Sequence, residues 1–172
     1  MAGSMMNKLG HILPVNRALL ICAAMSGGLL VAAFLFEYVG GLAPCEMCIW
    51  QRWAHVALIL TALSGLLIPT QIRAKPALMC VVVAAMISAA IAGFHAGVEW
   101  QLWDGPSGCT ASLNSSGDMS LLVDQLLATP VVRCDEVPWS LFGISMAGWN
   151  SILSLDIAGF ALMSWVANRQ AG

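Results

Sequence analysis

The chain has 172 residues, of which 59% are hydrophobic and 9% are charged. Because so few charged side chains cannot cover the surface of a water-soluble globule, the composition excludes a soluble protein and indicates an integral membrane protein. The net charge of −2 and the scattered Lys and Arg residues form no basic stripe that could follow a phosphate backbone, so we expect no nucleic-acid partner.

Long apolar runs alternate with polar segments along the chain, and each run is close to the roughly 20 residues that a helix needs to cross a bilayer. They predict transmembrane helices over residues 18–36, 49–68, 77–96 and 144–166. The connections between them are residues 37–48, 69–76 and 97–143. We therefore predict an all-α integral membrane protein, a four-helix transmembrane bundle in which residues 1–172 form a single membrane domain.

The connection over residues 97–143 is long and polar, and one part of it has a helical pattern. Asp118 is a suitable N-cap, apolar residues then recur at helical spacing as far as Leu127, and Pro130 follows. The pattern predicts a short helix that lies on the membrane surface. A helix packed on a small core of the loop itself is the alternative.

The cations predict how the bundle is oriented in the membrane. In the four-helix arrangement most of them fall on one side, and by the positive-inside rule that side is cytoplasmic, together with both termini. These cations are Lys8, Arg17, Arg73, Lys75 and Arg169. The connections 37–48 and 97–143 then lie outside, which in a bacterium is the periplasm, where disulfides form and persist.

The six cysteines divide by their surroundings. Cys22 and Cys80 lie within apolar runs, where cysteine behaves as a small hydrophobic residue. The remaining cysteines lie outside these runs and suggest two disulfides or redox pairs, although sequence alone allows three pairings. They are Cys45, Cys48, Cys109 and Cys134.

Cys45 and Cys48 form a Cys-x-x-Cys pair at the predicted start of the second transmembrane helix. The free N–H groups and the positive end of the helix dipole favour a thiolate there, and Cys48 is the better placed of the two. Arg52 follows one turn later on the same helical face. An arginine so close to the hydrocarbon is costly, which favours a functional role over a side chain that merely reaches the headgroups.

Two non-catalytic interpretations compete with a redox site. Four loop thiolates would be enough for tetrahedral zinc, but the second pair of cysteines is 25 residues apart and has no Cys-x-x-Cys spacing, so we expect no metal. Two static disulfides that hold the outer loops are the stronger competitor. Against them stands Arg52, which a passive disulfide does not require.

Further motifs extend the pattern over nearly the whole chain. Trp50-Gln51-Arg52-Trp53 follows the Cys-x-x-Cys pair, His95 stands near the end of the third apolar run, and a characteristic segment from Val137 to Asn150 leads into the last one. With these motifs the sequence resembles the disulfide bond formation protein B (DsbB) family, the quinone-dependent thiol oxidases of the bacterial inner membrane.

The resemblance implies a relay of thiol–disulfide exchanges that starts from a reduced periplasmic dithiol protein, DsbA in this family. Cys109 would form the mixed disulfide with this partner, and Cys134 would be the companion of Cys109. Cys45 would then exchange with that pair.

The resemblance also implies a membrane quinone, ubiquinone or menaquinone, as the cofactor that receives the electrons. Cys48 would be the thiolate that meets the quinone. Arg52 would contact the ring oxygens, and His95 is a secondary candidate for the same pocket. Sequence does not distinguish the two quinones.

Alternatives of other classes stay open at this point. The protein could be a specialised relative that serves one dedicated thiol partner, or a non-catalytic membrane scaffold with two structural disulfides. His55 and Asp156 belong to no motif and receive no role, and the sequence does not indicate the oligomeric state.

Overall fold

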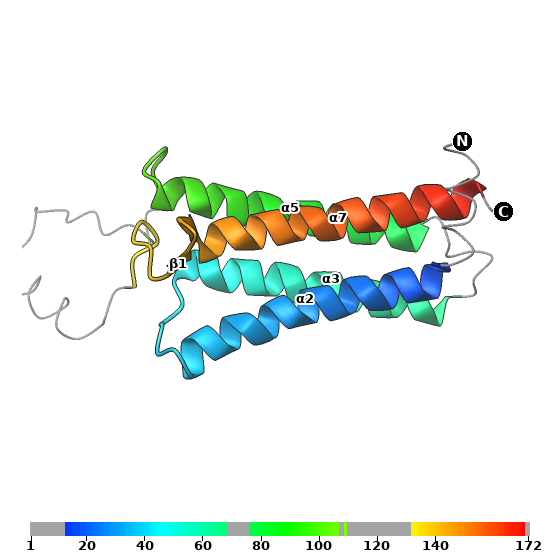
Figure 1. The fold of residues 1–172 in the computed structure, drawn as a ribbon, viewed down its shortest axis with the longest axis horizontal. Helices are drawn as coiled ribbons and strands as arrows, with labels where there is room; N and C mark the ends of the chain where they lie inside the picture. Colours follow the sequence, from blue (N-terminus) through cyan, green and yellow to red (C-terminus); the bar gives the residue numbers. More distant parts are fainter. Residues whose placement is uncertain (1–12, 69–75, 107–108, 110–131, 171–172) are drawn as a thin grey trace, which may run out of the picture.

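The structure is a computed structural model, and it describes residues 13–68, 76–106, 109 and 132–170. Four long helices make up most of this part of the chain. They are α2 (Val15–Tyr38), α3 (Glu46–Leu67), α5 (Pro76–Glu99) and α7 (Met146–Gln170). Figure 1 shows that they lie side by side along the long axis of the molecule, with successive helices running in opposite directions.

Each predicted transmembrane helix corresponds to one observed helix. Among the described residues, α2, α5 and α7 are long and apolar enough to cross a membrane, so the molecule is an all-helical membrane protein. The helix α3 does not meet that criterion because its first half contains Gln51, Arg52 and His55. That α3 is the fourth transmembrane helix stays a prediction.

Small residues allow the helices to approach one another closely. The core between the four helices contains side chains from each of them, including Leu19, Leu58, Val81 and Ile157, all of which are fully buried. The sequence of α5 is rich in alanine, and Ala85, Ala89 and Ala92 lie on its buried face. Membrane helices associate by this kind of packing, because burial against lipid gives no hydrophobic driving force.

Gly65 on α3 lies at a close contact between helices. A methyl group at this position would lie 3.0 Å from Cβ of Ala77 and 3.1 Å from Cδ1 of Leu19. We expect Gly65→Ala to lower the stability of the bundle by about 1–3 kcal/mol, the usual cost of overpacking. Thermal unfolding in detergent measures this, with Gly28→Ala on α2 as control because nothing lies within 4 Å of its added methyl.

The two cysteines predicted to be small hydrophobic residues occupy different environments. Cys22 is fully buried in the core, whereas Cys80 lies on the exposed face of α5, and both are free thiols. Asp156 also lies on an exposed face, that of α7, and not against a polar cavity inside the bundle.

The ends of the observed helices differ by a few residues from the ends of the predicted apolar runs. The helix α3 begins at Glu46, three residues before the run over 49–68, with Cys45 just ahead of it as the cap and Cys48 in its first turn. The last helix begins at Met146 and not at residue 144, because a two-stranded antiparallel hairpin precedes it. Its strands are β1 (Ser140–Leu141) and β2 (Ile144–Ser145). The predicted surface helix, from Asp118 to Leu127, lies outside the described residues.

Candidate functional site

The N-terminus of α3 positions the Cys-x-x-Cys pair. Cys45 is the N-cap residue with an extended backbone (φ −76°, ψ 171°), and its sulfur accepts a hydrogen bond from the backbone N–H of Cys48 at 3.2 Å. This bond satisfies one of the free N–H groups in the first helical turn, as Ser or Asp does at other helices. Cys48 is the third residue of the helix, where the dipole favours a negative charge.

The two sulfurs of the pair are free and lie 2.6 Å apart. The hydrogen bond to Cys48, and then burial, hold the pKa of the Cys45 thiol far above its usual range. Cys45 therefore holds its proton more strongly than an ordinary thiol does. The helix start thus gives two chemically identical side chains different surroundings.

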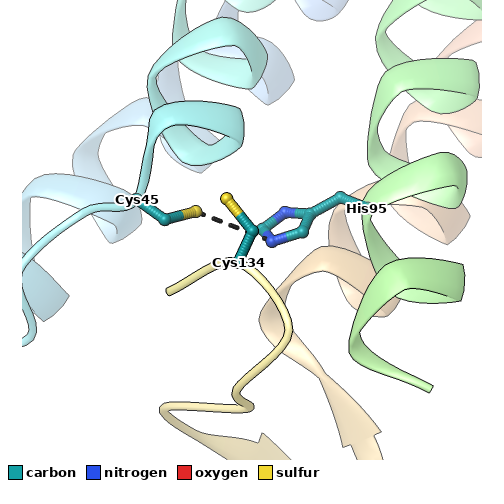
Figure 2. A group of neighbouring side chains, drawn as sticks. All are labelled: Cys45, His95 and Cys134. Carbon is teal, nitrogen blue, oxygen red and sulfur yellow. Dashed lines mark hydrogen bonds between the residues drawn. The ribbon is translucent and has the colours of Figure 1, made fainter. Parts of the chain in front are cut away.

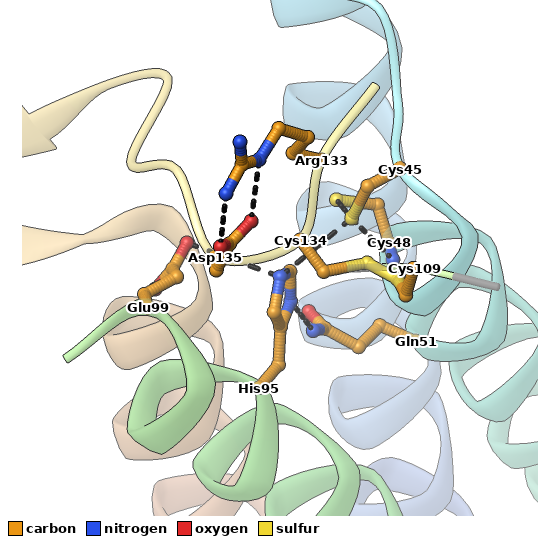
Figure 3. The surroundings of a disulfide bond; sticks show 9 residues. All are labelled: Cys45, Cys48, Gln51, His95, Glu99, Cys109, Arg133, Cys134 and Asp135. Carbon is orange, nitrogen blue, oxygen red and sulfur yellow. Dashed lines mark hydrogen bonds and ion pairs between the residues drawn. A yellow bond between two sulfur atoms is a disulfide. The ribbon is translucent and has the colours of Figure 1, made fainter. Parts of the chain in front are cut away.

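Cys109 and Cys134 form a disulfide, with their Cα atoms 5.3 Å apart. Both residues are buried, and the backbone N–H of Cys134 donates to the carbonyl oxygen of Cys109 at 2.9 Å. This is the pairing that the resemblance implies. Figure 3 shows the disulfide packed directly beside the Cys45 and Cys48 side chains.

An ion pair fixes the segment that carries Cys134. Arg133 donates from Nε to Oδ1 of Asp135 at 3.0 Å and from Nη2 to Oδ2 at 2.6 Å. Two parallel bonds of this kind define the orientation of both side chains. The guanidinium of Arg133 holds the pKa of Asp135 below its usual range. Figure 3 shows this ion pair next to the segment that carries Cys134, and Arg133 also lines the cavity described below.

The inner pair and the disulfide meet at one point. The sulfurs of Cys45 and Cys134 and a ring nitrogen of His95 all lie within 4.8 Å of one another, and all three residues are buried. Figure 2 shows the three side chains converging from α3, α5 and the 132–139 segment. Cys45 and Cys134 can therefore exchange after only a small movement. The same donors would suit zinc, but here the sulfur of Cys134 is bonded to Cys109.

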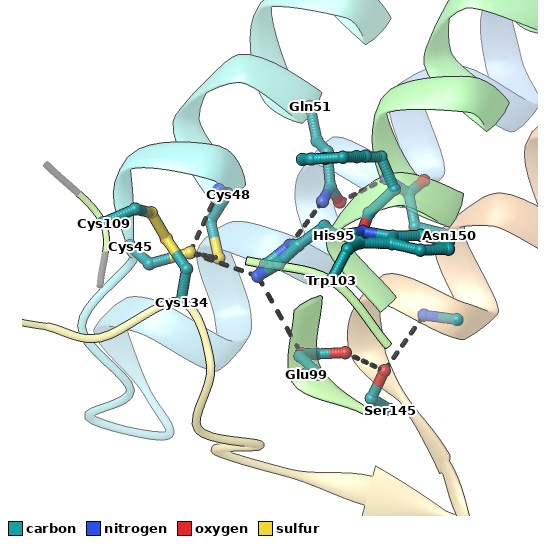
Figure 4. A network of polar contacts seen from close by, with 12 residues as sticks. Cys45, Cys48, Gln51, His95, Glu99, Trp103, Cys109, Cys134, Ser145 and Asn150 are labelled. Carbon is teal, nitrogen blue, oxygen red and sulfur yellow. Dashed lines mark hydrogen bonds and ion pairs between the residues drawn. A yellow bond between two sulfur atoms is a disulfide. The ribbon is translucent and has the colours of Figure 1, made fainter. Parts of the chain in front are cut away.

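His95 contacts Cys45 and two side chains, Gln51 and Glu99, that received no role from the sequence. Its Nε2 lies 3.6 Å from the sulfur of Cys45, and its Nδ1 lies 2.7 Å from Nε2 of Gln51. Oε1 of Glu99 lies 4.0 Å from Nε2 of His95. Ser145 in turn donates to Glu99, so the hairpin supports this carboxyl group (Figure 4).

A cavity of about 550 Å³ opens beside the sulfurs. Its walls are mostly apolar side chains of α2, α7 and the 132–141 segment, and Cys45, Cys48, Arg52 and His95 line its polar part. Pockets that bind organic cofactors usually combine a mainly apolar wall with a few polar groups. All the residues predicted for a quinone site therefore line one cavity.

Arg52 is anchored within this cavity by α2. Its guanidinium forms an ion pair with Glu37, donates to the carbonyl oxygen of Ala33 at 3.4 Å, and lies 4.9 Å above the ring of Phe34. The side chain is mostly shielded, at 15% exposure, so it does not extend freely into the surroundings. Glu37 is a further functional candidate that sequence reasoning missed, because its partner is 15 residues away.

Comparison with known proteins agrees with the chemistry of this site. The family model described as "Disulfide bond formation protein DsbB" matches residues 15–164. Proteins named "Disulfide bond formation protein B" are similar over most of their length. That of Aromatoleum aromaticum is 31% identical, with 87% of this chain and 90% of the relative covered. That of Shewanella frigidimarina is 35% identical, with 78% and 77% covered. That of Methylococcus capsulatus is 29% identical, with 85% and 88% covered.

The fold and the site define a helical membrane protein with two adjoining cysteine pairs. The match over most of the chain shows that it belongs to the DsbB family of disulfide bond formation proteins. No solved structure matches the chain.

Proposed function

We propose that the protein oxidises a periplasmic dithiol protein of the DsbA type and passes the electrons to a membrane quinone. The observation that carries this proposal is the contact between the two cysteine pairs beside an apolar cavity lined by Cys48 and Arg52. Two static disulfides would need neither the cavity nor the free Cys45 and Cys48 thiols.

The first half of the reaction would reduce the Cys109–Cys134 disulfide. A thiolate of the partner attacks the sulfur of Cys109, the bond between Cys109 and Cys134 breaks, and its electron pair stays on Cys134. The second thiol of the partner then attacks the mixed disulfide, and this releases Cys109. The partner has lost two electrons and two protons, and the loop pair has gained them.

The second half would move the electrons to the inner pair. The thiolate of Cys134 attacks Cys45 in a Cys45–Cys48 disulfide, and Cys48 leaves as a thiolate. Cys109 then attacks Cys134, which restores the loop disulfide and releases Cys45. The structure has this product arrangement, with Cys109 and Cys134 bonded and Cys45 and Cys48 free.

The residues around the cavity suit a quinone. Arg52 offers N–H donors for a ring oxygen, the Cys48 sulfur lies on the cavity wall, and α2 and α7 supply apolar walls. A quinone, when bound, would supply the two-electron acceptor that the cysteines lack. The chain would bind and orient it and keep water from the inner thiols.

The same proposal includes a bacterial inner-membrane location with four transmembrane helices. The start of α2, with Arg17, and the end of α7, with Arg169, lie at one end of the bundle, and the cysteine site lies at the other (Figure 1). Cations on one side favour a cytoplasmic location for that end. Lys8, Arg73 and Lys75 lie outside the described residues.

Purified protein in detergent tests the proposal when it is mixed with a reduced DsbA-like protein and ubiquinone or menaquinone. We expect the quinone absorbance to fall as the partner loses its thiols, with several turnovers per molecule. Without quinone, oxidation stops once the cysteine pairs are reduced. Unchanged quinone absorbance, with cysteines that resist mild reductant, would instead support a structural scaffold. The rates with a general and with a dedicated thiol partner distinguish a general oxidase from a specialised relative that serves one partner.

A further inference from the structure

A continuous chain of polar side chains, buried except for the half-buried Asn150, runs from the Cys45 site into the middle of the bundle. It passes from His95 on α5 to Gln51 on α3, Asn150 on α7 and back to His55 on α3. Gln51, His55 and His95 are 7%, 3% and 3% exposed. Figure 4 shows the part of this chain between the sulfurs and Asn150.

Every link of this chain has a defined donor. The ring nitrogen Nε2 of His55 donates to Oδ1 of Asn150 at 2.7 Å, because a carbonyl oxygen can only accept. The Nδ2 group of Asn150 donates to Oε1 of Gln51 at 2.7 Å. Because the amide oxygen of Gln51 accepts from Asn150, its amide nitrogen faces His95 and donates to Nδ1 of His95 at 2.7 Å. With the amides in this orientation, each amide satisfies both of its neighbours.

Serine side chains surround the far end of the chain. The hydroxyl of Ser26 on α2 lies 2.8 Å from Nδ1 of His55 and 3.3 Å from the backbone carbonyl oxygen of His55. Ser88 lies 3.4 Å from Nε2 of His55 and 3.1 Å from Ser154. Among the described residues, the buried side-chain atoms without a partner are Ser164 Oγ and Trp165 Nε1, and neither belongs to this chain.

The direction of the chain determines the tautomer of His95. A ring nitrogen that accepts from Gln51 cannot carry a proton, so the proton of the neutral ring is on Nε2. This is the nitrogen that lies 3.6 Å from the sulfur of Cys45 and within 4.8 Å of the sulfur of Cys134. The His95 N–H thus lies next to the two sulfurs that exchange, and the backbone of Cys134 is a further hydrogen-bond partner of the ring.

We propose that His95 is a catalytic hydrogen-bond donor in the exchange between Cys45 and Cys134, and that Gln51, Asn150 and His55 are positioning residues that hold its proton on Nε2. This inference rests on the proposed function and deepens it. The chain ends at the two sulfurs that exchange, which a network that only joined helices would not require.

The step that His95 assists is the release of Cys45. When the thiolate of Cys109 attacks Cys134 in a mixed disulfide between Cys45 and Cys134, the bond between Cys109 and Cys134 forms. The bond between Cys134 and Cys45 breaks, and its electron pair stays on the sulfur of Cys45. The Nε2–H of His95 donates a hydrogen bond to this developing thiolate, which speeds its departure.

The tautomer is measured directly by ¹⁵N NMR of full-length protein labelled at histidine, with the signals of His55 and His95 assigned by single substitutions. We expect wild-type His95 to carry its proton on Nε2 alone. In Gln51→Met, which removes the donor to Nδ1 at similar volume, both tautomers are expected. A wild-type His95 protonated at Nδ1 would overturn the proposal even if every variant failed to fold.

The exchange itself is followed without quinone in oxidised protein. A reduced dithiol partner is added, the reaction is quenched with acid, and the new thiols of Cys45 and Cys48 are labelled. We expect Gln51→Met to slow their appearance by about 10-fold, the lower end of what is lost when a group that orients a metal-bound histidine is removed. Ser151→Ala is the control, because its hydroxyl donates to the Ala89 carbonyl beside the chain.

The two proposals fail in different ways. If wild-type protein transfers electrons and Gln51→Met does so at the same rate, the role of the chain is wrong and the oxidase function stands. If wild-type protein transfers none while its His95 carries the expected proton, the oxidase function is wrong. Equal slowing in Gln51→Met and Ser151→Ala would mean that the chain only stabilises the bundle, and this too would overturn the inference.

Discussion

Replacement of Cys48 by serine is expected to abolish quinone reduction, with a loss of at least about 1,000-fold. Serine cannot form a disulfide with Cys45, so the inner pair can no longer accept two electrons from the Cys109–Cys134 pair. The loop disulfide itself is untouched by the change, because its bond and its backbone contact involve neither residue 45 nor residue 48.

The Cys48→Ser protein should therefore stop at a defined point and not lose all reactivity. Added reduced partner is expected to open the Cys109–Cys134 disulfide once, which gives a burst of about one partner oxidised per molecule followed by no turnover. Quinone absorbance and partner thiols are measured in the same sample. Cys80→Ser is the matched control, because Cys80 is a free thiol on the outer face of α5. Continued turnover in Cys48→Ser would rule out the relay.

The helices could be predicted because their signal is local and repeated, whereas their exact ends depend on single contacts. The apolar run begins at residue 49, three residues after the first residue of α3, and the cap itself is not visible in the sequence because cysteine is not a usual N-cap residue. The predicted start of the last helix failed for a related reason. Phe142 and Gly143 both have positive φ, 53° and 78°, which is the two-residue hairpin turn.

The helix α3 shows that functional residues can also obscure a transmembrane helix. Gln51, Arg52 and His55 make its first half too polar for a simple transmembrane pattern, although it packs along the other three helices (Figure 1). In the structure these side chains face the cavity or the buried polar chain and not the outer surface. Polar residues that weaken the transmembrane signal are thus the ones that form the site.

The residues proposed for the cysteine site lie together in the structure, but their geometry could not be predicted. Cys-x-x-Cys and Arg52 are close in sequence, and the resemblance supplied the remaining members. The partners of His95 could not be found in this way, because Gln51 is 44 residues from it and Asn150 is 99 residues from Gln51. Such contacts arise only when α3, α5 and α7 pack together. A glutamine or asparagine in a membrane helix was the only available signal.

Arg52→Gln is expected to raise the KM for quinone by about 10-fold to 100-fold, the effect of losing a charged hydrogen-bond donor worth about 1.5–3 kcal/mol. The exchange between Cys45 and Cys134 should change less than the KM does, because Arg52 contacts Glu37, Ala33 and Phe34 and not these two sulfurs. Quinone reduction at varied quinone concentration separates this effect from the rate of thiol transfer.

A substitution of Glu37 tests the same role of Arg52 from the opposite direction, because Glu37 forms the ion pair with Arg52. The ion pair holds the guanidinium against α2, with support from Ala33 and Phe34. Glu37→Gln keeps a hydrogen-bond acceptor of the same size but removes the charge, so Arg52 can bind a ring oxygen without competition. We expect Glu37→Gln to lower the KM for quinone, or to leave it unchanged, where Arg52→Gln raises it.

The control for this pair is Arg169→Gln at the opposite end of the bundle. Arg169 lies 4.6 Å above the ring of Trp165, a contact of the same kind as that of Arg52 with Phe34, but far from the cavity. Its replacement should leave the KM for quinone and the thiol transfer rate unchanged. If Arg52→Gln instead slows thiol transfer and does not change the KM, Arg52 acts on the cysteines, and the quinone must contact other residues.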